Sequence, residues 1–501
     1  MKKTLVFVFK SLDIIRGGLT KAVLNRANTL AEYNNEVIFL TLAFQPRFDS
    51  IIKELHKSGS LDKRIKVINF FNDILKLDKS KRKSSKDVVE EKGFYVFKDE
   101  NQSKPSYRYY KDGLYVKYKR YNKSGDLLFV DYMNESRHRY QRDEFNNKGA
   151  IIRSRQMDLF SNKPRLDSYY DNSGHCAITI WIDDKGKEGR TLFFDKRNPK
   201  EYSKLDDFYK AWVEQKLSKL SSPVVISDSR KTDDIVAKIS SNKVKKVAVL
   251  HNNHFKSPYD HTAGIKKSWD PFFNNINLFN RIVFLTEEQK EDVENKFGKL
   301  KSAVVIPHAV PKTEKQKNEN KVEVNPNLVV TLARYKKQKR LDEAIKAFSY
   351  VVKEIPDAKY HIYGFGDLQG ELESLIKKLN LTNNVKLLGF TSDAIKTYKS
   401  AACSVLTSDF EGFGLVLTES LAAGTPVVSY DIKYGPKDII RQGIDGYLVP
   451  KGDQKGMADK IIALLKNSKL RDELSNNATQ VAKRFSIEKY ETSWKNLIEN
   501  I

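Results

Sequence analysis

The stretch EGFGLVLTESLAAGTPVV occupies residues 411–428 and places two carboxylates, Glu411 and Glu419, on either side of a glycine-rich turn. Its apolar residues recur with helical rather than alternating spacing, so the pattern predicts a helix that begins near Phe413. Gly424, followed by Thr and Pro, ends this helix before a second short apolar run that is typical of a buried strand. The segment therefore predicts a strand–turn–helix–strand unit.

The start of this helix is a predicted anion site. A free helix N-terminus offers unpaired backbone N–H groups and a partial positive charge, and Gly412 and Gly414 leave it open to a pyrophosphate. Glu419, two turns into the helix, can accept hydrogen bonds from a ribose diol, and Glu411 is placed to meet a hexose beyond the phosphates. The alternative is that both carboxylates are ordinary charges on an amphipathic helix.

Length and composition indicate a large globular chain. The 501 residues suggest about three domains, and 40% of them are hydrophobic. No apolar run reaches the length of a membrane span, and the apolar residues after Met1 meet Lys10 too soon for a signal peptide. Cys176 and Cys403 lie in regions assigned to different domains, which argues against a disulfide and favours the cytoplasm.

The formal net charge is +25, from 89 Lys and Arg against 64 Asp and Glu. Such a chain attracts polyanions, whether nucleic acid, anionic lipid headgroups or a phosphate-containing polymer. Charge indicates the class of partner and leaves its identity open.

The order of patterns predicts two α/β domains and an insertion. Strands and helices alternate from residue 1 to about 72, until a basic linker at 78–86. Short alternating strands then recur, with turns at 121–125, 145–149, 170–174 and 183–186, which predicts an antiparallel meander. The predicted domains are 1–76 with 205–312, the insertion 77–204, and 325–486 after a linker at 313–324, while the helix at 487–501 is expected to cross back onto the first domain.

Other residues suited to binding or catalysis follow predicted strands. Gly17 and Gly18 open the first helix, where backbone can approach a phosphate. Arg334 and Lys339 follow the first strand of the second domain and could neutralise a departing diphosphate, although a solvated basic loop is the alternative. His251 and His254 have metal-ligand spacing, but no nearby cysteine or carboxylate completes a metal site.

The motif at 409–429 resembles the signature of the retaining family 4 glycosyltransferases, whose fold is GT-B. The resemblance implies an α/β protein of two Rossmann-like domains, a UDP-sugar donor, and no metal or other cofactor, in keeping with the absence of an Asp-x-Asp triplet. It implies that Ala333 replaces a family glycine and that His261 and His308 are structural. It assigns catalytic roles to Glu411, Arg334, Lys339 and His251, and donor contacts to Gly17, Gly18, His254, Gly366, Leu388, Thr391, Phe413, Gly414, Leu415 and Glu419.

The insertion has two interpretations. Basic and aromatic residues alternate at 107–111 and 115–121, a pattern that on a sheet can bind single-stranded nucleic acid or form a solvated face. With its domain order, the chain resembles poly(ribitol- or glycerol-phosphate) α-glycosyltransferases of wall teichoic acid. That resemblance implies a β domain that forms a homotrimer and helps hold the anionic polymer, with no nucleic-acid partner.

The sequence therefore predicts a cytoplasmic, retaining transferase that moves an α-hexosyl unit from a UDP-sugar to a teichoic acid, with possible association with the inner face of the membrane. The alternatives are an O-glycosyltransferase of Ser-rich adhesins and, in another class, a nucleic-acid-binding protein. The sequence leaves open glucose or N-acetylglucosamine as the donor sugar, ribitol- or glycerol-phosphate as the acceptor, the acceptor hydroxyl, and processivity.

Overall fold

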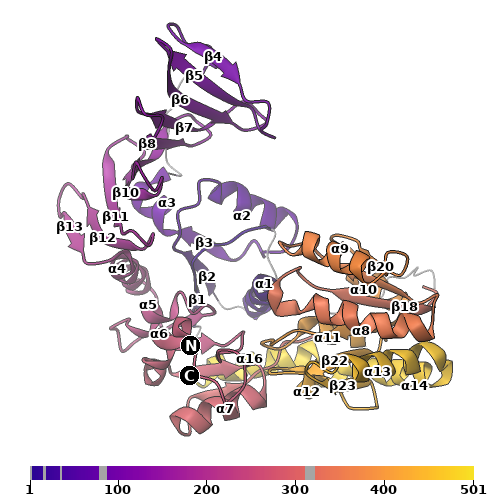
Figure 1. The fold of residues 1–501 in the computed structure, drawn as a ribbon. Coiled ribbons are helices and arrows are strands. Elements are labelled where there is room, and N and C mark those ends of the chain that lie inside the picture. Colours follow the sequence, from indigo (N-terminus) through magenta and orange to yellow (C-terminus); the bar gives the residue numbers. More distant parts are fainter. Residues whose placement is uncertain (1–2, 15–17, 34–35, 78–86, 311–321) are drawn as a thin grey trace. The chain divides into compact units, whose positions relative to one another are not determined.

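The structure is a computed structural model that describes residues 3–14, 18–33, 36–77, 87–310 and 322–501 (Figure 1). It divides into two compact units. Unit 1 takes in residues 1–16, 31–227 and 231–245, and unit 2 takes in 17–30, 228–230 and 246–501. Gly17, the basic linker at 78–86 and most of the linker at 313–324 lie outside the described residues.

Unit 1 contains a run of parallel strands in the order β14-β1-β2-β3. Residues 4–8 of β1 are all buried, as expected of a parallel strand covered on both faces. This confirms the alternating strand–helix prediction for the start of the chain. The elements are β1 (Thr4–Phe9), β2 (Glu36–Thr41), α2 (Phe48–Lys57), β3 (Lys66–Asn69), α3 (Phe70–Leu75), α4 (Leu205–Leu217), β14 (Pro223–Ser227) and α5 (Asp233–Ala237).

The inserted region forms a ten-stranded antiparallel sheet in which the strands follow one another in chain order, as the meander prediction required. Its strands are β4 (Tyr95–Lys98), β5 (Ser106–Lys111), β6 (Leu114–Tyr121), β7 (Leu127–Met133), β8 (Arg139–Phe145), β9 (Ile151–Met157), β10 (Pro164–Tyr170), β11 (Cys176–Ile182), β12 (Glu188–Phe193) and β13 (Lys200–Tyr202).

The four predicted turns of this sheet share one construction. At the first, the Asn122 side-chain oxygen accepts hydrogen bonds from the N–H groups of Ser124 and Asp126, at 2.8 and 2.9 Å. Asn146, Asp171 and Asp183 make the same pair of bonds at the other three turns. A glycine with positive φ follows three residues later in each case, a conformation that side chains disfavour.

The basic residues of the inserted sheet are largely paired within it. Lys119 contacts Asp87 and Glu91, and Lys117 also contacts Glu91. Asp131 accepts hydrogen bonds from Arg142 on the neighbouring strand at 2.6 and 2.7 Å. These internal pairs reduce the positive charge that the aromatic and basic pattern offers to a nucleic acid.

Unit 2 holds two further sets of parallel strands, β15-β16-β17 and the six-stranded sheet β20-β19-β18-β21-β22-β23. The strands are β15 (Lys245–Val249), β16 (Arg281–Phe284), β17 (Ala303–Val305), β18 (Asn325–Leu332), β19 (Lys359–Tyr363), β20 (Val385–Leu387), β21 (Ala401–Leu406), β22 (Val427–Asp431) and β23 (Gly446–Pro450).

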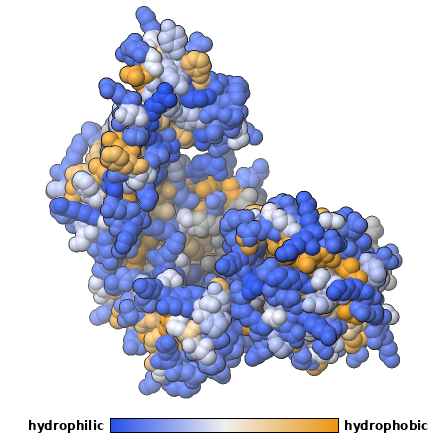
Figure 2. Space-filling model, viewed as in Figure 1, coloured by the Kyte–Doolittle hydropathy of each residue, from blue (hydrophilic) through white to orange (hydrophobic). Residues whose placement is uncertain are grey.

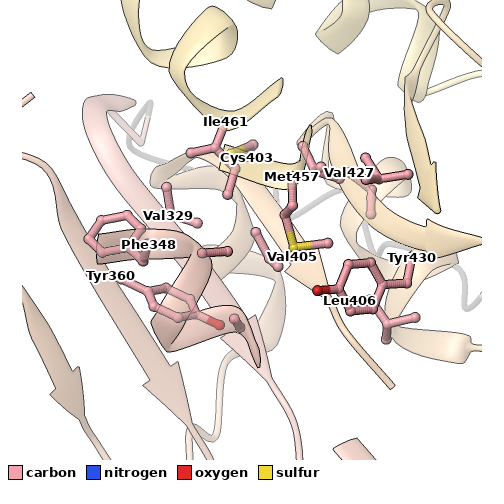
Figure 3. Packing of buried hydrophobic residues seen from close by; sticks show 14 of the residues in the cluster. Val329, Phe348, Tyr360, Cys403, Val405, Leu406, Val427, Tyr430, Met457 and Ile461 are labelled. Carbon is pink, nitrogen blue, oxygen red and sulfur yellow. The ribbon is translucent and has the colours of Figure 1, made fainter. Parts of the chain in front are cut away.

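The helices of unit 2 include those that cover the six-stranded sheet, where Phe348 and Met457 pack on Val405 and its neighbours in the core (Figure 3). They are α1 (Gly18–Glu32, within unit 2 to Leu30), α6 (Asp270–Phe273), α7 (Glu287–Phe297), α8 (Leu341–Glu354), α9 (Gln369–Lys378), α10 (Ala394–Lys399), α11 (Leu415–Ala422), α12 (Pro436–Ile439), α13 (Gln454–Lys466), α14 (Ser468–Ala478), α15 (Val481–Arg484) and α16 (Ile487–Glu499), with 3-10 turns η2 (Lys267–Trp269), η3 (Ile276–Leu278) and η4 (Lys337–Lys339).

One predicted helix is divided in the structure. The periodicity predicts a single helix over 469–484, but α14 ends at Ala478 and α15 begins at Val481. At the break, the Thr479 hydroxyl donates to the carbonyl of Asn476 at 2.9 Å. Such local side-chain bonds compete with the helical ladder, which hydrophobic periodicity does not reveal.

In the described part of the chain, no helix combines the length and apolar character needed to cross a membrane. Hydrophilic residues dominate the face shown in Figure 2, with hydrophobic residues in smaller groups among them.

We expect Phe70→Ala to destabilise unit 1. The Phe70 ring is fully buried and meets Phe208, Tyr209 and Trp212 edge-on, with centroids 4.8–5.4 Å away. The loss of this contact and the resulting cavity should lower the free energy of unfolding by about 3–5 kcal/mol in urea titrations. Phe160→Ala, at a ring that is 94% exposed, is the control and should change it by less than about 0.5 kcal/mol; equal effects would contradict the prediction.

Candidate active site

The glycine-rich turn joins β21 to α11, as predicted. The helix begins at Leu415, two residues later than the sequence indicates, because Gly414 adopts φ 92° and stands outside it. Gly414 carries no side chain that could cap the helix. The Leu417 N–H donates to the Gly414 carbonyl at 2.9 Å, so the N–H groups of Leu415 and Val416 are the candidates for an anion.

Glu411 forms a short ion pair with Lys339. The Lys339 Nζ lies 2.5 Å from Glu411 Oε1, and the Ser408 hydroxyl donates to the same oxygen at 2.6 Å. The Lys339 and Glu411 side chains are only 14% and 11% exposed. The structure therefore brings together two predicted catalytic residues that lie 72 positions apart and adds Ser408, which the sequence analysis did not identify.

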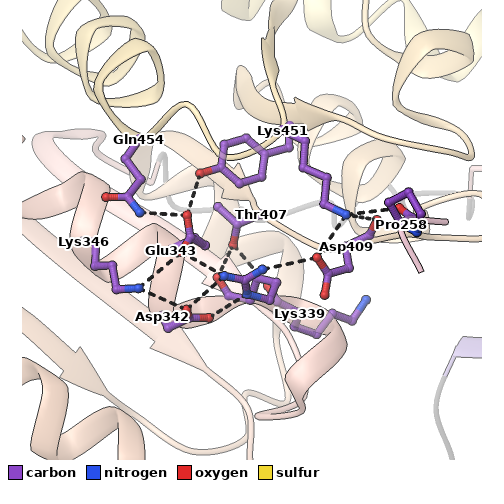
Figure 4. A network of polar contacts seen from close by, with 11 residues as sticks. Pro258, Lys339, Asp342, Glu343, Lys346, Thr407, Asp409, Lys451 and Gln454 are labelled. Carbon is purple, nitrogen blue, oxygen red and sulfur yellow. Dashed lines mark hydrogen bonds and ion pairs between the residues drawn. The ribbon is translucent and has the colours of Figure 1, made fainter. Parts of the chain in front are cut away.

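The two loops that carry this pair are bonded to each other along their backbones. The Thr407 hydroxyl donates to the carbonyls of Lys339 and Arg340 at 3.1 and 2.9 Å (Figure 4). Gln338 accepts from the N–H of Asp409 at 2.8 Å and donates its side-chain amide to the carbonyl of Phe410 at 2.7 Å. These bonds hold the loop that carries Lys339 against the loop that carries Glu411.

Arg334 is exposed at the end of β18. Within the described ranges its guanidinium makes no hydrogen bond or ion pair with the protein, in contrast to Lys339. The structure thus provides one free cation and one paired cation in the predicted motif.

His251 lies in a second buried polar group. Its Nε2 is 2.7 Å from Asp228 Oδ1, and the other oxygen of Asp228 accepts from Arg26 at 2.5 Å. The His308 ring stacks on the His251 ring with centroids 5.5 Å apart. Burial lowers the pKa of His251, although the Asp228 carboxylate opposes this, and burial holds the pKa of His308 well below its usual value.

Gly412 lies directly against the backbone of His251 and Asn252. A Cβ at this position would stand 1.9 Å from the carbonyl oxygen of His251 and 2.8 Å from the N–H nitrogen of Asn252. Only glycine permits such an approach. Similarly, a Cβ on Gly18, at the start of α1, would lie 3.2 Å from Leu415.

The other residues predicted to contact the donor sugar nucleotide are Gly366, after β19, Leu388 and Thr391, after β20, and Glu419, in α11. Gly366 packs against the backbone of Tyr335, where a Cβ would lie 2.4 Å from a carbonyl oxygen. Leu388 is 42% exposed, and the Thr391 hydroxyl bonds to that of Thr397 at 3.1 Å. Glu419 is largely enclosed in α11, and burial raises its pKa, partly offset by Lys21.

Two residues that were predicted to contact the donor sugar nucleotide are buried. His254 is fully buried, with Phe255, Phe273 and Tyr434 rings within 6.0 Å. Phe413 is buried between the rings of His308 and Phe485. Donor contact by either side chain stays a prediction, and the geometry favours a packing role for both.

The described residues contain no cluster of three or more His, Cys, Asp or Glu side chains suited to a metal ion. The positively charged groups at the site are Arg334, Lys339 and the start of α11, and their binding of a diphosphate stays a prediction.

The chain is similar to known glycosyltransferases. Residues 312–481 match the family Glycosyl transferases group 1, and residues 6–185 match Glycosyl transferase 1 domain A. The chain is 29% identical over 509 residues to the poly(ribitol-phosphate) alpha-N-acetylglucosaminyltransferase of Staphylococcus aureus (strain COL), covering 100% of both. It is 28% identical over 510 residues to the poly(glycerol-phosphate) alpha-glucosyltransferase of Bacillus subtilis (strain 168), covering 97% of this chain and 74% of that protein.

A crystal structure of an S. aureus TarM mutant in complex with Fondaparinux, alpha-GlcNAc-glycerol and UDP has a TM-score of 0.85 at 27% identity, with 99% of each chain covered. The present chain is therefore a glycosyltransferase with the GT-B fold, which confirms the fold class predicted from the sequence. Within that class it is similar over nearly its whole length to a poly(ribitol-phosphate) and a poly(glycerol-phosphate) alpha-glycosyltransferase.

The burial of His254 predicts a pH-dependent stability. Burial, and secondarily nearby lysines, lower the pKa of His254 to about 3, whereas an unfolded histidine titrates near about 6.5. Between these values the unfolded chain binds one more proton, so stability is lost as the pH falls, by about 1.4 kcal/mol per pH unit. His254→Phe should remove this contribution in urea titrations at about pH 6 and about pH 5. His175→Phe, at an exposed turn, should leave the slope intact, and an unchanged slope in His254→Phe would disprove the assignment.

Proposed function

We propose that this chain is a retaining glycosyltransferase that moves an α-linked glucose or N-acetylglucosamine from a UDP-sugar to hydroxyl groups of a poly(ribitol-phosphate) or poly(glycerol-phosphate) wall teichoic acid. The observation that carries the proposal is the similarity, over 97% or more of this chain, to transferases of both polymers, together with the Lys339–Glu411 pair in the loops that precede α8 and α11.

The arrangement suggests how the donor is held. The diphosphate would bind the N–H groups that open α11 together with Arg334 and Lys339, which would stabilise the charge that grows on the leaving group. No metal is required in this proposal, because the two cations and the helix start supply the positive charge. Once Lys339 turns to the diphosphate, Glu411 is released to accept hydrogen bonds from hexose hydroxyls.

Retention would follow from attack on the same face of the sugar that the diphosphate leaves. The departing phosphate oxygen would accept the proton of the acceptor hydroxyl, so the enzyme needs no separate general base. Glu411 then orients the hexose rather than acting as a nucleophile.

The acceptor is proposed from charge and similarity. A polyol-phosphate polymer carries one negative charge per repeat, which suits a protein of net charge +25. We further propose that the protein works in the cytoplasm, at times against the inner face of the membrane, as a homotrimer assembled through the inserted sheet.

Transfer assays test the acceptor. Radiolabelled UDP-glucose and UDP-N-acetylglucosamine would each be offered with purified ribitol-phosphate polymer, glycerol-phosphate polymer, Ser-rich peptide or RNA. Label is expected on one of the two polymers and on neither of the other acceptors. Transfer only to the peptide would favour the adhesin enzyme, and no transfer to either polymer would reject the proposal.

Substitutions in the ion pair test the site. Lys339→Ala is expected to reduce transfer by about a hundredfold or more, because a charge-stabilising group is removed. Glu411→Ala is expected to reduce it by about a hundredfold, because the hexose loses the group that orients it. Lys337→Ala, an exposed lysine on the same 3-10 turn, is the matched control and should retain activity. Circular dichroism would verify folding, and a folded Glu411→Ala or Lys339→Ala protein with normal activity would refute the assigned roles.

A further inference from the structure

Asp228 is a buried carboxylate that the sequence analysis did not identify and that the proposed chemistry does not yet use. It follows β14 and accepts hydrogen bonds from two residues, Arg26 of α1 and His251 after β15. The side chains of Arg26, Asp228 and His251 are 1%, 3% and 7% exposed. The three residues come from separate parts of the sequence and meet only in the fold.

The hydrogen-bonding capacity of the group decides where the imidazole proton lies. Burial would raise the pKa of Asp228, but the Arg26 charge and the His251 hydrogen bond hold it below its usual range, so the side chain is an ionised acceptor. A carboxylate can only accept, so the single proton of a neutral His251 must lie on Nε2. Nδ1 then carries a lone pair.

That lone pair has no donor in the described part of the protein. His251 Nδ1 is buried and makes no hydrogen bond there. Buried polar atoms are normally paired, so an unpaired one beside a candidate site calls for an explanation, and a hydrogen-bond donor on a ligand supplies one. The proposed donor substrate brings hexose hydroxyl groups, which supply O–H donors of this kind.

We propose that Asp228, held by Arg26, is a positioning residue that fixes the Nε2–H tautomer of His251 and so presents the Nδ1 lone pair to a hydroxyl group of the bound hexose. The inference deepens the proposed function and rests on it. Asp228 itself does not touch the sugar in this arrangement; it acts through the imidazole.

Neighbouring aromatic rings hold the side chains of Arg26 and His251 in place. The Trp494 ring of α16 stacks on the Arg26 guanidinium, 4.5 Å from its carbon to the ring centroid. The His308 ring covers one face of His251, and Phe413 meets His308 edge-on at 5.6 Å. Arg26 is thus fixed by α16 on one side and by Asp228 on the other, and His251 has little freedom to rotate.

Kinetics of Asp228→Asn test the proposal. An asparagine can donate to Nε2 and thereby favour the opposite tautomer, so kcat/KM for UDP-sugar cleavage should fall about tenfold to a hundredfold, as expected for a misplaced catalytic contact. In a His251→Gln background the same substitution should change it less than about twofold, because the two residues act as one unit.

A matched control separates this effect from lost stability. Asp445 is also a fully buried carboxylate, bonded to Arg441 at 2.7 Å, and among the described residues its side chain bonds to no histidine. Asp445→Asn should lower the melting temperature as Asp228→Asn does while leaving kcat/KM within about twofold. Equal kinetic losses in both variants, or an undiminished effect of Asp228→Asn in the His251→Gln background, would overturn the proposal.

The tautomer can be observed without any turnover. In 15N-histidine-labelled protein, the His251 signals, assigned by their loss in His251→Gln, should show a protonated Nε2 and a bare Nδ1. A protonated Nδ1 in the wild-type protein would overturn the proposal even if Asp228→Asn failed to fold. Because this measurement needs no substrate, it distinguishes failure of the inference from failure of the proposed function.

Discussion

The near contact between Gly412 and the carbonyl of His251 is the constraint on which the site depends. It leaves no space for a side chain, so the loop that carries Glu411 must lie directly against the loop that carries His251. The absence of a side chain at position 412 lets Glu411, in the loop after β21, lie close to His251, in the loop after β15. The glycine-rich motif is therefore a packing requirement as well as an anion site.

Two buried ion pairs occupy this region, and both depend on hydrogen bonds from more than one partner. Glu411 is bonded to Lys339 and Ser408, and Asp228 to Arg26 and His251. A buried charge is costly unless its partners satisfy it, so each pair restricts its side chains to a narrow set of positions. Arg334, exposed and without a protein partner among the described residues, is free to meet a ligand. The site combines paired carboxylates with one exposed cation.

The sequence predicted the order of strands and helices because hydrophobic periodicity and turn residues are local signals. The four Asx turns of the inserted sheet and the motif at 411–428 were found for that reason. Asp228 and Ser408 carried no such signal, since an isolated Asp after a strand or a Ser in a loop is common in every fold. Their importance arises from partners that are distant along the chain, which only the fold reveals.

His254 shows the converse limit. Because it lies three residues after His251, the sequence analysis predicted that it also contacts the donor sugar nucleotide. In the structure its ring packs among aromatic side chains. Trp269 of η2, Phe273 of α6 and Tyr434 surround that ring, and Tyr434 in turn donates to Asp292 at 2.8 Å. Spacing along a sequence cannot distinguish two such histidines, because the direction of each side chain depends on what packs around it.

The Lys339–Glu411 pair also bears on the end of the reaction cycle. If Lys339 receives the diphosphate as proposed, its ammonium group has two competing anions, one from the nucleotide and one from the protein. After sugar transfer, the spent nucleotide no longer brings a hexose to occupy Glu411, and the carboxylate is free to recapture the ammonium. The resting ion pair would then act as an internal competitor that weakens product retention and resets the enzyme for the next donor.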